Sequence, residues 1–260
     1  MPAVENITYA DGVAAWLVRP NDEATAPDPF AGVVLWHWFS QEPLGDRNQF
    51  LDEARELAGR GVVCLLPQGR FPWFEDPTGA DNDVAAIDGE VARFSAGLDL
   101  LAARADVDQD RLAVVGHDFG AMLASIVAAR EQRVRAAVLI APTPRWGDWF
   151  LPFWEIREER SPYLRALEPH DPQAQMASIA PRPVLLQLAD RDYFVPVMAG
   201  FELRRASGEL HALVVRQYDA DHEMASNDAR RDRTSFLTEA LGLSIGAGQP
   251  EPRAPPPGRT

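Results

Sequence analysis

Short runs of apolar residues alternate with longer segments of mixed polarity along most of the chain. Five runs carry Val, Ile and Leu at consecutive rather than alternate positions: residues 31–37, 61–67, 111–116, 134–141 and 182–189. A strand that is buried on both faces needs this continuity, so the runs predict a parallel sheet covered by helices. Further strands are predicted over residues 212–218, 5–9 and 14–20, the last two as an antiparallel pair.

The segments between these runs have the polarity pattern of helices. They predict helices over residues 47–60, 83–104, 119–131, 195–207 and 228–241. Strands that alternate with helices are typical of an α/β fold with a doubly wound, mostly parallel sheet, here of about eight strands. We expect residues 1–243 to form a single domain of this kind.

Two segments interrupt the alternation. Residues 142–180 are rich in Pro and Trp, too aromatic for a disordered linker and too rich in Pro for one long helix. We expect them to form a short insert or small lid over the carboxyl edge of the sheet. Residues 244–260 are rich in Gly and Pro without an apolar period, which predicts a flexible tail.

Composition narrows the chemistry that the chain can perform. All 25 basic residues are Arg, which excludes Schiff-base, pyridoxal-phosphate and P-loop lysines. The single cysteine, Cys64, excludes an intramolecular disulfide and a zinc site built from cysteines. A net charge of −14 opposes binding to nucleic acid. We expect a small-molecule substrate, no cofactor, no metal, and a monomer or homodimer.

Neither a membrane span nor a secretory signal is evident in the sequence. The chain has no run of about 18 apolar residues, so we expect no transmembrane helix and no membrane partner. The first residues lack a basic region followed by an apolar stretch. These observations favour a cytoplasmic location.

The strand predicted over residues 111–116 leads into a sharp turn with the pattern Gly-x-Asp-x-Gly. Gly116 and Gly120 flank Asp118, and a helical segment follows. A strand, a strained tight turn and a helix in this order lift the central side chain above the sheet at a helix N-terminus. The pattern predicts that Asp118 is a nucleophile or a base, although an Asp at this place could also serve only as a helix cap.

Two further candidate residues follow in the chain order that this turn requires, nucleophile, acid and then histidine. Asp192 follows the strand predicted over residues 182–189, and His222 follows the last predicted strand. We expect Asp192, rather than its neighbour Asp190, to orient His222. We also expect backbone N–H groups of Trp38 and Phe119 to form an oxyanion hole.

These features resemble the α/β-hydrolase superfamily, and in particular its branch of dienelactone hydrolases, over roughly residues 10–242. The branch has a G-x-x-D-x-x-V-P pattern, in which Ala189 here replaces the Gly and Asp192 stands at the acid position. The resemblance implies an α/β-hydrolase fold and a cofactor-independent hydrolase. An Asp at the elbow instead of Cys or Ser resembles haloalkane dehalogenases and epoxide hydrolases.

The chemistry of a carboxylate narrows the expected substrate. Attack of Asp118 on an ester would produce an anhydride, which is more activated than the ester itself. Attack on a saturated carbon that bears a halide, or on an epoxide, would produce an ordinary ester that water activated by His222 could hydrolyse. This favours a small neutral organohalide or epoxide. An esterase or lactonase with Asp118 as general base, and a non-catalytic ligand-binding relative, remain alternatives.

Several side chains are candidates to bind the substrate or its leaving group. A halide needs N–H or Arg donors in an apolar pocket, and the candidates are Trp38, Trp146, Trp149, Trp154 and Arg145. An opening epoxide commonly takes a proton from a Tyr hydroxyl. The predicted substrate-binding residues are His37, Trp146, Trp149, Tyr163 and Tyr193.

Overall fold

A computed structural model describes residues 1–21, 29–39, 46–208 and 213–243, so the predicted tail 244–260 and position 212 lie outside the described residues. Eight strands form one sheet in the order β1-β2-β4-β3-β5-β6-β7-β8. The strands are β1 (Ala3–Tyr9), β2 (Val13–Arg19), β3 (Phe30–Trp36), β4 (Val62–Pro67), β5 (Val107–His117), β6 (Val134–Ile140), β7 (Val184–Ala189) and β8 (Leu213–Tyr218).

The sheet is parallel except at its N-terminal edge. β1 pairs with β2, and β2 with β4, in antiparallel register, while every pair from β4 through β3, β5, β6 and β7 to β8 is parallel. β4 and β7 are buried at every position, as the continuous apolar runs predict. The predicted doubly wound α/β architecture with a mostly parallel sheet of about eight strands is confirmed.

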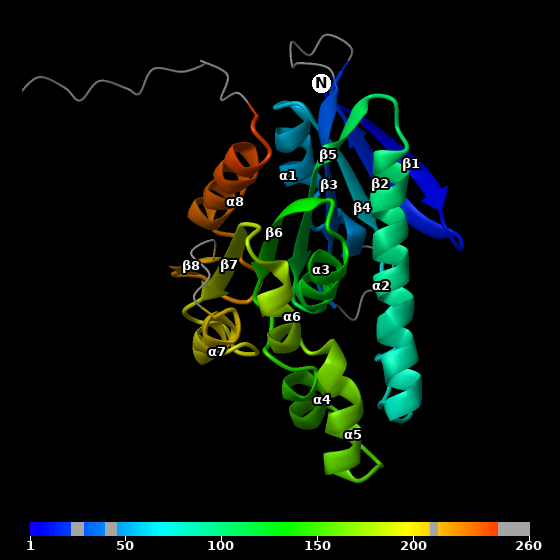
Figure 1. Ribbon diagram of the computed structural model, residues 1–260, viewed down its shortest axis with the longest axis vertical. Coiled ribbons are helices and arrows are strands. Elements are labelled where there is room, and N and C mark those ends of the chain that lie inside the picture. The colour runs from blue at the N-terminus through cyan, green and yellow to red at the C-terminus, as the bar shows by residue number, and fades with distance from the viewer. Residues whose placement is uncertain (22–28, 40–45, 209–212, 244–260) are drawn as a thin grey trace, which may run out of the picture.

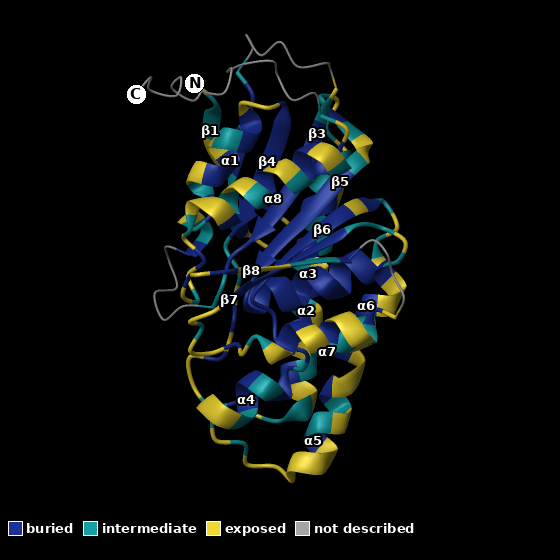
Figure 2. Cartoon of the chain, turned by 90° about the vertical axis from the view of Figure 1, so that its left-hand side faces the viewer, coloured by how far each residue is buried: buried dark blue, intermediate teal, exposed yellow. Residues whose placement is uncertain are grey.

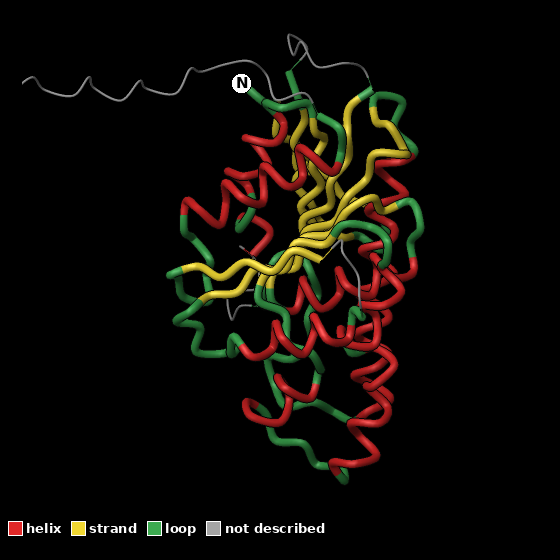
Figure 3. The backbone as a smooth tube through the Cα atoms, turned by 60° about the vertical axis from the view of Figure 1, so that its left-hand side comes forward, coloured by secondary structure: helices red, strands yellow, loops and turns green. Residues whose placement is uncertain are grey.

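Helices cover both faces of the sheet (Figure 1; Figure 3). The helices on one face are α1 (Leu51–Ala58) and α8 (Asn227–Ala240). Those on the other are α2 (Ala80–Ala102), α3 (Phe119–Arg130), α6 (Pro172–Ile179) and α7 (Met198–Ala206). The helix predicted from residue 47 begins at Leu51, because residues 46–48 form a short 3₁₀ turn, η1 (Asp46–Asn48). Among the described helices, none is both long and apolar enough to cross a bilayer.

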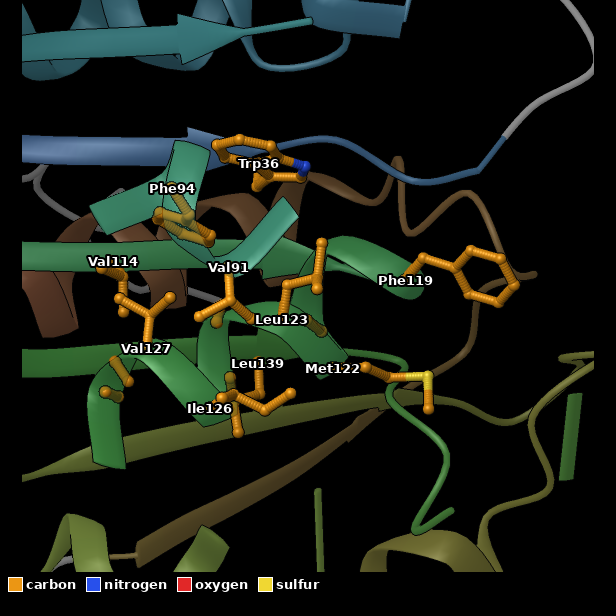
Figure 4. Packing of buried hydrophobic residues seen from close by; sticks show 14 of the residues in the cluster. Trp36, Val91, Phe94, Val114, Phe119, Met122, Leu123, Ile126, Val127 and Leu139 are labelled. Atoms are coloured by element: carbon orange, nitrogen blue, oxygen red, sulfur yellow. The ribbon is translucent and has the colours of Figure 1, made fainter. Parts of the chain in front are cut away.

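The strands and the inner faces of the helices form two buried clusters, one on each side of the sheet (Figure 2). On the side of α2 and α3, Trp36 at the end of β3 stacks on Phe94 of α2 with ring centroids 4.6 Å apart. Figure 4 shows this packing, and it also shows that Phe119 points away from it at the start of α3. The ring of Phe119 therefore belongs to the region above the sheet, where the insert lies.

The Pro-rich insert, which was predicted not to form one long helix, consists of short helices. They are α4 (Gly147–Phe153), α5 (Arg160–Leu167), the 3₁₀ turn η2 (Glu168–His170) and then α6. Prolines stand in the first turns of η2 and α6, where they are compatible with a helix start, whereas Pro152 lies inside the short helix α4. Because α6 packs on α3 as part of the helical layer, the segment that projects beyond the sheet in Figure 1 is confined to α4 and α5.

Candidate active site

The turn between β5 and α3 has the geometry of a nucleophile elbow. Asp118 has φ 56° and ψ −120°, a left-handed backbone conformation that costs energy for a residue with a side chain. A Cβ atom at Gly116 would lie 2.1 Å from the carbonyl oxygen of Gly120, and one at Gly120 would lie 2.3 Å from that of Trp36. Both glycines are therefore required by contact between backbones, which explains the Gly-x-Asp-x-Gly pattern.

The Asp118 carboxylate is buried, with 2% of the residue exposed, and its two oxygens differ. Oδ2 accepts a hydrogen bond from the backbone N–H of Phe39 at 3.1 Å. Oδ1 has no hydrogen-bond partner among the described residues. Burial raises the pKa of Asp118 to about 7, although the charge of His222 and the N–H groups of Phe39 and Phe119 oppose the rise.

His222 and Asp192 form the predicted pair. Nδ1 of His222 lies 2.8 Å from Oδ2 of Asp192, while the other oxygen of Asp192 accepts from the backbone N–H groups of Phe194 and Val195. Asp190, the alternative acid, is exposed. Burial favours the neutral imidazole, but the bond to Asp192 and the negative charge of Asp118 outweigh it and raise the pKa of His222.

Aromatic rings surround the His222 imidazole. Trp38 lies parallel to it at 6.4 Å between ring centroids, and Phe194 and Trp149 meet it edge-on at 5.0 and 5.9 Å. These rings limit the access of bulk water, so the charges of Asp118 and His222 interact in surroundings of low polarity.

One of the two expected oxyanion donors, in the loop after β3, differs from the prediction. The backbone N–H of Trp38 donates to Oε1 of Gln49 at 3.0 Å and is thus occupied, whereas the next N–H, that of Phe39, reaches Asp118. Gln49 also hydrogen-bonds Nδ1 of His117, which joins this loop to the elbow. The sequence located the loop but missed Phe39, because the side chain of Gln49 decides which N–H is free.

Three predicted substrate-binding residues are placed elsewhere by the structure. His37 is buried; its Nδ1 lies 2.5 Å from the Trp38 carbonyl oxygen, and its Nε2 accepts from the N–H of Gly69. Tyr163 is fully buried and donates its hydroxyl to Asp83 at 2.9 Å. Tyr193 is 85% exposed and does not line the cleft. Their assignment as substrate ligands is wrong, and neither tyrosine is placed to protonate an epoxide.

The tryptophans of the insert and Arg145 differ in whether they line the cleft and in whether their N–H groups already have partners. The indole N–H of Trp146 donates to the carbonyl of His170, and that of Trp154 to the carbonyl of Trp73. Arg145 pairs with Asp148 and Glu202 and does not line the cleft. Trp149 does line it, and its buried N–H has no partner among the described residues. Of these candidates, Trp149 alone keeps a free donor at the site.

Asp118 and His222 line a cleft of about 1280 Å³. Aromatic side chains form one part of its wall, and residues 75–79 and 157–158 contribute a more polar stretch. The described lining residues are Phe39, Trp73, Phe74, Glu75, Asp76, Pro77, Thr78, Gly79, Asp118, Trp149, Phe153, Trp154, Ile156, Arg157, Glu158, Phe194 and His222.

A doubly wound sheet, a strained elbow and a histidine–carboxylate pair in this order define an α/β hydrolase. Residues 72–228 match the family model described as "alpha/beta hydrolase fold", and the chain belongs to this family. It is therefore a hydrolase of α/β fold.

Three known proteins show how far this similarity extends. Esterase EstD of Thermotoga maritima is 31% identical over 144 residues, which are 54% of this chain but only 32% of that protein. The esterase Pf2001 of Pyrococcus furiosus superposes with a TM-score of 0.62 at 17% identity, covering 92% of each chain. A putative dienelactone hydrolase from Klebsiella pneumoniae superposes with a TM-score of 0.60 at 19% identity, covering 93% and 98%. The two structures establish a shared fold only.

Proposed function

We propose that the protein hydrolyses small esters or lactones, with Asp118 as general base and His222 as general acid. One observation carries the proposal: a buried carboxylate with a pKa of about 7 and an imidazole with a raised pKa line the same cleft. General acid–base hydrolysis needs an anionic base beside a protonated acid, and the raised pKa of His222 favours its protonated form.

The steps follow from these protonation states. Oδ1 of Asp118 takes a proton from water, whose oxygen attacks the ester carbonyl carbon. The N–H of Phe39, which donates to Oδ2 of Asp118, becomes available to the oxyanion as Asp118 loses its charge. The carbon–oxygen bond then breaks, and His222 donates its proton to the leaving alkoxide. A proton transfer from Asp118 to His222 restores the pair.

The relatives support esters as the substrate class. EstD and Pf2001 are esterases by name, and the putative dienelactone hydrolase is named for a lactone. The site itself gives less support to the organohalide or epoxide that we expected from the sequence. Both tyrosines lie away from the cleft, and most of the candidate halide donors already have partners.

The rate of ester hydrolysis is expected to depend on pH in a bell shape. kcat/KM falls below about pH 7 because Asp118, whose pKa is raised to about 7, takes up a proton and ceases to be a base. At higher pH it falls again because His222 loses the proton that it must donate; its raised pKa moves this limb upward. Initial rates with methyl butyrate, whose alkoxide leaving group needs a proton, measure both limbs between pH 5 and 10 by titration of the released acid. A plateau that persists to pH 10 would contradict the role of His222.

A second candidate function rests on the contact between Phe39 and Asp118. If Asp118 were a nucleophile towards an organohalide, Oδ1 would form the bond to carbon, and Oδ2 would already lie at a backbone donor for the later hydrolysis of the alkyl ester. His222 would then act as a base on water, so the rate would not fall at alkaline pH. The alkaline limb of the pH profile thus separates the two functions.

A further inference from the structure

The described residues that line the cleft carry more negative than positive charge. Among its described lining residues away from Asp118 and His222, three carry carboxylates, Glu75, Asp76 and Glu158, and one carries a guanidinium, Arg157. The unpartnered Oδ1 atom of the buried Asp118 adds a further negative group to the same cleft near neutral pH. Arg145, a candidate halide donor, is paired with Asp148 and Glu202 and does not line the cleft, so Arg157 is the one guanidinium among the described lining residues.

Hydrogen bonds hold this acidic side of the cleft in place. Oδ1 of Asp76 accepts from the backbone N–H of Glu155 at 3.0 Å, and Oε2 of Glu158 accepts from that of Ala80 at 3.3 Å. The indole of Trp154 donates to the carbonyl of Trp73, which links the same two segments. Asp76 and Glu158 are therefore held in place at the rim of the cleft, and Glu75, next to Asp76 in the chain, is exposed there.

The walls of the cleft suit a cation as well. Phe39 contacts Phe74 and Trp154 at centroid distances of 5.2 and 6.0 Å, and Phe153 contacts Phe194 at 5.6 Å. The faces of such rings attract ammonium groups, most strongly where water is excluded. Aromatic walls and carboxylates together favour an apolar molecule with a positively charged end.

We propose that the substrate carries an ammonium or quaternary ammonium group, which lies among Glu75, Asp76 and Glu158 while its ester lies at Asp118. This inference rests on the proposed ester hydrolysis for the reaction, but the charge preference belongs to the cleft itself. The negative charge of the whole chain, −14, acts in the same direction by drawing cations towards the surface.

Three p-nitrophenyl esters of equal acyl length, ending in trimethylammonium, methyl or carboxylate, test the inference. At low salt, kcat/KM is expected to be about three- to tenfold higher for the cationic ester than for the neutral one, and lowest for the anionic ester. The differences shrink in 0.5 M salt. Equal rates for the three esters, or the reverse order, would overturn the inference.

Variants locate the preference in the cleft. In the double variant Glu75→Gln/Glu158→Gln, the ratio of cationic to neutral rates is expected to fall about threefold or more. The amide oxygen introduced at position 158 can still accept from the N–H of Ala80, so the rim keeps this contact. Asp228→Asn/Glu239→Gln on α8 makes the same change in net charge and is expected to keep the ratio. An unchanged ratio in the first variant, or an equal fall in both, would overturn the assignment to Glu75 and Glu158.

Binding without turnover separates this inference from the proposed function. Quenching of tryptophan fluorescence in the wild-type protein reports binding of hexyltrimethylammonium and of heptanoate, because Trp149 and Trp154 line the cleft. Tighter binding of the cation by about threefold or more, in a protein that hydrolyses no ester, would leave the charge preference standing and refute the ester proposal. Equal or tighter binding of heptanoate would refute the charge preference.

Discussion

Replacing Asp118 by Asn is expected to lower kcat/KM for p-nitrophenyl esters by about 10²- to 10⁴-fold, the usual contribution of a positioned general base. Asn has the same shape, and its side-chain oxygen can still accept from the N–H of Phe39, so the elbow keeps its contacts. What is lost is the basic oxygen Oδ1, which is buried without a hydrogen-bond partner among the described residues, on a residue that lines the same cleft as His222. Initial rates at pH 8, where wild-type Asp118 is ionised, measure the loss.

The matched control is Asp190→Asn. Asp190 lies two residues from Asp192, is exposed and loses the same charge on substitution, but it does not contact His222. Its rate is expected to stay within about twofold of wild type, since a surface substitution away from the reacting groups has small effects. An Asp118→Asn protein that is folded and keeps more than a tenth of the wild-type rate would contradict the role of Asp118. A wild-type protein inert towards esters and organohalides would favour a non-catalytic relative.

Replacing Gly120 by Ala is expected to destabilise the fold by about 3 kcal/mol or more, at the upper end of the range for overpacking. The added Cβ would lie 2.3 Å from the carbonyl oxygen of Trp36 and 2.5 Å from that of His37, and neither can move without shifting β3. For a chain of this size the loss corresponds to a fall in Tm of roughly 6–12 °C. Thermal unfolding followed by circular dichroism measures it.

Gly89→Ala is the control, and the opposite change in stability is expected for it. Gly89 lies within α2, and its added Cβ would meet the flexible guanidinium of Arg93 at 3.4 Å as its nearest neighbour. Ala stabilises a helix interior by about 0.5–1 kcal/mol relative to Gly, so Tm should rise slightly. A Gly120→Ala protein with the Tm of wild type would show that α3 and β3 do not approach each other as closely as the elbow geometry requires.

The sequence predicted the elements of the fold well because the central strands are buried on both faces. β4 and β7 are apolar at nearly every position, and the helices between the strands differ from the predicted ranges by only a few residues at each end. The order of Asp118, Asp192 and His222 was also predictable, since strands that run parallel end at the same edge of the sheet. The structure places Asp192 against His222 as that order requires.

The remaining errors concern the direction in which side chains point. No local pattern shows that the hydroxyl of Tyr163 reaches Asp83, eighty residues earlier in the chain, instead of the cleft. The sequence also could not show that Gln49 occupies the N–H of Trp38 and leaves that of Phe39 for Asp118. Such contacts depend on tertiary packing, so only the structure shows that Trp146, Trp154 and Arg145 already have partners as donors and that the indole N–H of Trp149 has none among the described residues.

The central claim is that Asp118 acts as a base and forms no covalent bond to the substrate. Hydrolysis of p-nitrophenyl butyrate in H₂¹⁸O over many turnovers tests it most directly. After digestion, mass spectrometry of the peptide that contains Asp118 and of the released butyrate shows where the isotope resides. General-base catalysis predicts ¹⁸O in butyrate and none in Asp118, because water attacks the ester directly. Incorporation of ¹⁸O into the Asp118 carboxylate would contradict it and identify Asp118 as a nucleophile.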